Sequence, residues 1–117
     1  MTVATVLTVL GVVAAASVFA CVRYSVTERV NGSFPYGTLV VNIAAAGLAG
    51  AGSQLDDPWS TIVLIGALGT LSTWSAVAME VGALARAGEG RAAALYTIAT
   101  VTTGLLAAWL GIQAATL

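Results

Sequence analysis

At residues 66–75 the chain reads GALGTLSTWS, in the middle of a run of 22 uncharged residues, 58–79. A helix needs roughly 20 apolar residues to cross the ~30 Å hydrocarbon core of a bilayer. Three more uncharged runs of this kind occur, at 1–22, 30–55 and 92–117. We therefore predict an all-α membrane protein in which four transmembrane helices occupy residues 1–117 as one domain.

The composition excludes several classes of protein. Of the 117 residues 59% are hydrophobic and only 8% are charged, whereas a soluble domain carries about 25% charged residues. The net charge is −1, and the chain has four arginines but no lysine and no histidine. This offers no basic surface for a nucleic acid, no histidine for catalysis or metal binding, and no pair of cysteines. We expect a lipid bilayer as the environment, no nucleic-acid partner and no enzymatic activity.

The turn-forming residues set the expected limits of the four helices. These limits are Val3–Val22, Tyr36–Gln54, Trp59–Leu84 and Ala92–Ala115. The second helix is unusually rich in alanine and glycine between residues 44 and 52. Helices in membranes approach closely where their residues are small, so we expect this segment to pack inside the bundle.

The stretch 66–75 supports two interpretations. Two glycines and four hydroxyl residues lie near the expected centre of the bilayer. They are compatible with a continuous helix in which Ser and Thr bond their own backbone. They are equally compatible with a helix broken near mid-membrane, where irregular backbone is tolerated if protein or a water-filled cavity surrounds it.

Polar side chains in the other helices are few. Tyr96, Thr100 and Thr103 follow the spacing i, i+4 and i+7, which places them on one face of the fourth helix. Asn42 is the one side-chain amide well inside a predicted span, and it either joins helices or donates to an anion. Glu80 lies toward the end of the third helix, where we expect an interfacial carboxylate that reaches water or pairs with an arginine.

Two sequence motifs, GTLVVN at 37–42 and GALGTLSTWSAVAME at 66–80, occur together with Arg23-Tyr24 at the end of the first helix and Tyr96 in the fourth. In this combination they resemble the CrcB/Fluc family of fluoride channels. The order and spacing of these motifs extend over nearly the whole chain. The family's two pore phenylalanines of the third helix correspond to Trp74 and Val77, so one of the aromatic rings is absent here.

The resemblance implies a passive channel through which fluoride leaves the cytoplasm. It implies an inverted dimer, with Asn42 as a donor to the ion and a third helix that is broken. The implied fluoride pathway comprises Asn42, Thr73, Trp74, Ser75, Val77, Tyr96, Thr100 and Thr103. A structural Na⁺ at the dimer interface is implied on the backbone carbonyls of Gly69, Thr70, Leu71 and Ser72.

All four arginines lie in or beside the connections 23–35 and 85–91, which are on one side of the membrane in a four-span chain. The other side carries both termini and Asp56-Asp57. The positive-inside rule then places both connections in the cytoplasm and both termini outside, in the plasma membrane. A chain with one fixed orientation favours an oppositely oriented homologue, rather than a second copy, as its partner in an inverted dimer.

Two other functions remain open. One is a four-span transporter of the small multidrug-resistance type, which needs a buried carboxylate in its first helix. Residues 1–22 contain no Asp or Glu, and this counts against it. The other is a membrane assembly subunit that conducts nothing and uses its small residues for packing.

Overall fold

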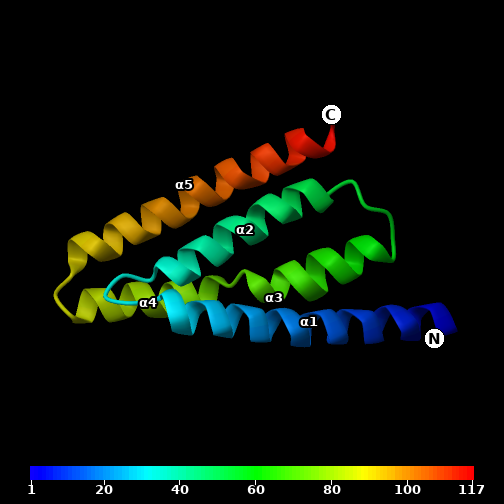
Figure 1. Ribbon diagram of the computed structural model, residues 1–117, viewed down its shortest axis with the longest axis horizontal. Coiled ribbons are helices and arrows are strands. Elements are labelled where there is room, and N and C mark those ends of the chain that lie inside the picture. The colour runs from blue at the N-terminus through cyan, green and yellow to red at the C-terminus, as the bar shows by residue number, and fades with distance from the viewer.

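The computed structural model describes residues 1–117, and every regular element in it is helical. The elements are α1 (Val3–Val30), α2 (Tyr36–Gly52), η1 (Thr61–Leu68), α3 (Gly69–Leu71), α4 (Trp74–Arg86) and α5 (Gly90–Ala115). Four rods run side by side, because η1, α3 and α4 follow one another along a single rod (Figure 1). The predicted four-helix architecture is confirmed.

Three of the rods are long and apolar enough to cross a membrane: α1 with 28 residues, Thr61–Arg86 with 26, and α5 with 26. At 1.5 Å per residue, α1 is about 42 Å long and exceeds the hydrocarbon core. Helix α2 has 17 residues, which is about 26 Å and slightly less than the core thickness. The chain is a multi-pass membrane protein.

Helix α1 extends further than its uncharged run. We expected the first helix to end at Val22, but it continues to Val30, and Asn31 is its C-terminal cap. The eight additional residues include no glycine or proline, so nothing in them ends the helix before Asn31-Gly32. The last two turns of α1 therefore carry Arg23 and Arg29 beyond the apolar segment.

Helices α2 and α5 form the closest pair, and glycines make this approach possible. A Cβ atom on Gly50 would overlap the backbone of Ala108, and one on Gly111 would overlap the backbone of Gly47. Gly47 itself faces Ala107 at ordinary contact distance. The expectation that the small residues of α2 pack inside the bundle is confirmed for Ala45, Gly50 and Gly52, which are buried, whereas Ala44 and Ala51 are exposed.

The third rod is interrupted between α3 and α4. Ser72 (φ −87°, ψ 132°) and Thr73 (φ −147°, ψ 120°) are extended, and the Thr73 side chain caps α4 by accepting a hydrogen bond from the Ala76 amide at 3.3 Å. The predicted break is confirmed and lies at the end of the 69–73 segment. The π-helical winding of η1 before the break was not predicted.

The interior of the bundle is small. Val41, Ala45, Leu68 and Leu71 form its buried cluster, while α1 contributes no buried residue. Large apolar side chains are exposed on the outer faces of all four rods. This distribution is typical of a protein that lipid surrounds, where apolar surface needs no covering.

Candidate anion site at the helix break

Two buried hydrogen-bond donors beside the break have no partner. They are Nδ2 of Asn42 on α2 and Oγ1 of Thr100 on α5, and both residues are 8% exposed. Both line one pocket of about 170 Å³, whose walls are formed by Asn42, Ala46, Ser72, Thr73, Trp74, Thr100 and Gly104. Buried polar groups without partners are rare in proteins, so this pocket is suited to a ligand that accepts hydrogen bonds.

The break determines which way the Asn42 amide faces. The backbone N–H of Thr73 donates to Oδ1 of Asn42 at 3.0 Å. Because a backbone N–H can only donate, the Asn42 atom that faces it must be the oxygen. The amino group of Asn42 is therefore the atom left free, and the helix break and the free donor depend on the same side chain.

The other predicted pathway residues near the break differ in their surroundings. Thr73 and Trp74 line the pocket, and Trp74 is 61% exposed. The Ser75 hydroxyl is 2.8 Å from that of Thr73 on the exposed side of the rod. Val77 is 1% exposed and is not part of the pocket wall. The hydroxyl of Thr103 bonds the Ala99 carbonyl, as serines and threonines in helices often do.

A second polar group lies one helical turn away. Tyr96 precedes Thr100 on α5 by four residues, and Thr38 precedes Asn42 on α2 by four, so each pair shares a helix face. The Tyr96 hydroxyl donates to Oε2 of Glu80, and the Thr38 hydroxyl donates to Oε1, both at 2.6 Å. Glu80 forms no ion pair with an arginine, but it is half-buried and lines two pockets, so the expectation that it reaches water stays a prediction. Its partners are neutral donors, because α4 turns it toward α2 and α5.

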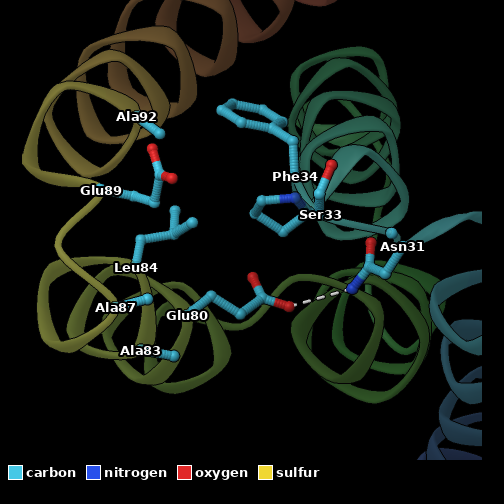
Figure 2. A pocket seen from close by; sticks show the side chains of 11 residues that line it. Asn31, Ser33, Phe34, Glu80, Ala83, Leu84, Ala87, Glu89 and Ala92 are labelled. Atoms are coloured by element: carbon cyan, nitrogen blue, oxygen red, sulfur yellow. Dashed lines mark hydrogen bonds between the residues drawn. The ribbon is translucent and has the colours of Figure 1, made fainter.

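Asn31 completes what we call the carboxylate cluster: Asn31, Thr38, Glu80 and Tyr96. Its Nδ2 is 3.1 Å from Oε1 of Glu80 (Figure 2) and also donates to the Thr38 hydroxyl. The cluster adjoins a pocket of about 520 Å³ between residues 31–35 and the start of α5, and another of about 330 Å³ against α1. Of these four residues, only Tyr96 was predicted as a site residue. The hydrogen bonds of the other three join positions up to 49 residues apart, and no local pattern in the sequence reveals such pairs.

The break also releases backbone oxygens. The last hydrogen bond of α3 runs from the Ser72 amide to the Leu68 carbonyl, and the next amide, that of Thr73, bonds Asn42 instead. The carbonyls of residues 69–71 therefore lack the partners they would have in a continuous helix. The hydroxyl of Thr70 already donates to the Gly66 carbonyl. The group of Thr70 that can bind a ligand is therefore its backbone carbonyl rather than its hydroxyl.

The sequence of the chain is similar to those of known proteins. The family described as CrcB-like protein, Camphor Resistance (CrcB), matches residues 8–112. The fluoride-specific ion channel FluC of Vibrio campbellii is 34% identical over 119 residues, which covers 92% of this chain and 94% of that protein.

Two Brucella proteins are similar as well. FluC 1 of Brucella melitensis and FluC 2 of Brucella abortus, both named fluoride-specific ion channels, are each 38% identical over 95 residues. These matches cover 74% of this chain and, respectively, 77% and 74% of the two relatives. The matched segment and the similarity to several channels lead to one conclusion: the chain belongs to the CrcB-like protein family.

Proposed function

We propose that this chain is one subunit of a fluoride channel that lets fluoride leave the cytoplasm passively. The observation that carries this proposal is the pair of free donors, Nδ2 of Asn42 and Oγ1 of Thr100, in one pocket beside the helix break. The names of the similar proteins support fluoride as the ion.

The chemistry of the pocket suits a small anion that must also leave again. Fluoride holds its water strongly, so a pathway has to replace that water with donors. The pocket offers an amide and a hydroxyl but no arginine or lysine, which would hold the ion tightly. Helix α4 begins at Trp74 in the pocket wall, so the positive end of its dipole adds a weaker attraction.

The further pathway residues follow from this site. Tyr96 lies one turn below Thr100, and Thr103 about one turn above it, so α5 carries the predicted track. Beyond the pocket, the close glycine contacts of Gly50 and Gly111 close the space between α2 and α5. In our proposal the ion therefore continues along the exposed side of the break, past Trp74 and Ser75, where a second subunit completes the path.

We further propose a structural Na⁺ where two such breaks meet in a dimer. The oxygens for it are the carbonyls of Gly69, Thr70, Leu71 and Ser72, and Gly69 and Ser72 are exposed on the subunit surface. Backbone oxygen suits a hard cation. No group of three or more His, Cys, Asp or Glu residues offers an alternative metal site in the chain. The ion would fix the two breaks against each other.

The dimer we propose pairs this chain with an oppositely oriented homologue in the plasma membrane. Both termini lie at one end of the bundle and the connections that follow α1 and α4 lie at the other (Figure 1). All four arginines belong to that second end, so the chain should insert with it in the cytoplasm. The names FluC 1 and FluC 2 show that some relatives occur as numbered sets.

Labelling of a C-terminal tag in intact cells tests the orientation. We expect every tag to be accessible from outside. Equal labelling of inside and outside populations, or strong fluoride flux from this chain purified alone, would end the proposal of a heterodimer while leaving the channel itself intact.

Fluoride efflux from liposomes tests the function and separates it from the two rivals. A channel moves fluoride down its gradient without a proton gradient, a transporter of the multidrug-resistance type moves organic cations, and an assembly subunit moves neither. We propose no enzymatic activity for the chain. Fluoride efflux that requires a proton gradient contradicts the proposal. So does the absence of fluoride efflux both from the chain alone and from the chain paired with a homologue.

A further inference from the structure

Asn31 uses every hydrogen-bonding atom of its amide. It caps α1, and its Oδ1 accepts a hydrogen bond from the Thr38 backbone amide in the first turn of α2 at 3.1 Å. Its Nδ2 donates to Oε1 of Glu80 and to Oγ1 of Thr38, each at 3.1 Å. One side chain at the junction of two helices thus contacts a third helix, α4.

These contacts determine the direction of the Thr38 proton. A hydroxyl has one proton to donate, and Asn31 can only donate through its Nδ2. The Thr38 proton therefore points to Glu80, in agreement with the short distance of 2.6 Å. Oε1 of Glu80 receives two donors and Oε2 receives the Tyr96 hydroxyl, so the carboxylate is held from three sides.

We propose that Asn31 is a positioning residue of the ion pathway, which holds the Glu80 carboxylate on the hydroxyls of Thr38 and Tyr96. The inference rests on the proposed function, because Thr38 and Tyr96 lie one helical turn from the two free donors. Without the Asn31 donor, the carboxylate is held by two hydroxyls alone and can turn further into either of the two pockets that it lines.

The surroundings make such a movement costly for an anion. Glu80 already lines both pockets, together with Glu89 in the larger one and with Arg23 and Glu28 in the smaller one. When it loses the Asn31 donor and turns further into either space, its negative charge is less neutralised there and repels fluoride as it approaches the anion site. Asn31 acts on the flux through Glu80 and need not touch the ion.

Two variants separate this role from capping. Asn31→Asp keeps an oxygen for the Thr38 backbone amide, so the cap remains, but it replaces the donor to Glu80 with a second carboxylate. In the double variant N31D/E80Q the donor and the acceptor change places. The amide introduced at position 80 donates to the carboxylate introduced at position 31 and to the Thr38 hydroxyl, and its oxygen still accepts from the Tyr96 hydroxyl. Gly32→Ala is the matched control, because a Cβ there meets nothing within 4 Å.

Fluoride efflux is measured from liposomes that contain the assembled channel, with gel filtration to verify assembly. We expect Asn31→Asp to lower the flux about tenfold or more, the effect of losing one hydrogen bond to a charged group. The double variant should return to within about threefold of the wild type, since the two residues act as a pair. Gly32→Ala should not change the flux.

An Asn31→Asp channel that conducts within about twofold of the wild type overturns the inference. So does an assembled double variant that conducts as poorly as Asn31→Asp. If Asn31→Asp does not assemble, the double variant decides alone: assembly with flux supports the inference, and failure of either overturns it. A wild-type chain without flux is a failure of the proposed function itself.

Discussion

Asn42→Asp separates the two roles of the side chain at the centre of the site. Oδ1 holds the Thr73 amide at 3.0 Å, and Nδ2 is the free donor in the pocket. An aspartate keeps an oxygen for Thr73, so the helix break should persist. It removes the donor and places a negative charge where the ion should bind.

The expected effect is large. At about 3 Å and an effective dielectric constant of about 20, two like charges repel by about 5 kcal/mol. Loss of the donor adds about 1.5–3 kcal/mol, the contribution of a hydrogen bond to a charged group. Since each 1.4 kcal/mol corresponds to a factor of ten, the repulsion alone should slow fluoride by a factor on the order of 10³ to 10⁴.

The assay is fluoride efflux from liposomes, with gel filtration and thermal unfolding of the same preparation. Asn42→Ala is the comparison, because it leaves the Thr73 amide without an acceptor and should cost about 1–3 kcal/mol of stability. The aspartate variant keeps the acceptor for Thr73, so it should lose flux while the protein still assembles in gel filtration, although the buried charge lowers its stability. If it assembles normally and conducts within about tenfold of the wild type, Asn42 is not a donor to the ion.

Three further predictions concern the pocket, the helix pair and the outer turn. Gly104→Leu should abolish flux without lowering the unfolding temperature, because a Cβ there meets nothing within 4 Å and the larger side chain can extend into the pocket that Gly104 lines. A conducting variant would show that the ion does not pass there. Gly50→Val should cost about 1–3 kcal/mol of stability, because its Cβ would overlap the Ala108 backbone, whereas Gly90→Ala, in open space, should be neutral in the same thermal assay. Hydrogen bonds from the hydroxyls of Ser60 and Thr61 hold the pKa of Asp57 below its ordinary value of 3.8. The stabilisation is therefore present above pH 3.8 and is lost as the pH falls through the lower pKa of the folded state, so thermal unfolding over a pH series should show a loss that Asp57→Asn lacks.

Charge spacing was enough to predict the four rods. The second, third and fourth helices begin and end within a few residues of the limits set by Pro35, Asp56-Asp57 and Gly88. The end of α1 could not be predicted in this way. Arg23–Val30 is charged but still helical, so the end of the apolar run and the end of the helix are different residues.

The site was predictable in part. Composition left the break at 66–75 undecided, and only the family resemblance favoured it. What no local pattern contains is the partner of each polar group: Asn42 meets Thr73 across 31 positions, and Asn31 meets Glu80 across 49. The partners of Glu80 were not predicted for this reason, because its depth along the helix could be read from the sequence while the face it presents to α2 and α5 could not.

Electrode-monitored efflux from liposomes loaded with equal fluoride and chloride shows whether this chain is a subunit of a fluoride-selective channel. The chain is reconstituted alone and together with an oppositely oriented CrcB-family homologue, and dimer formation is verified in both preparations. We expect rapid loss of fluoride with retention of chloride when the two chains are present, without any proton gradient. Fluoride retention equal to that of empty liposomes, in both preparations and with dimers present, would contradict this expectation.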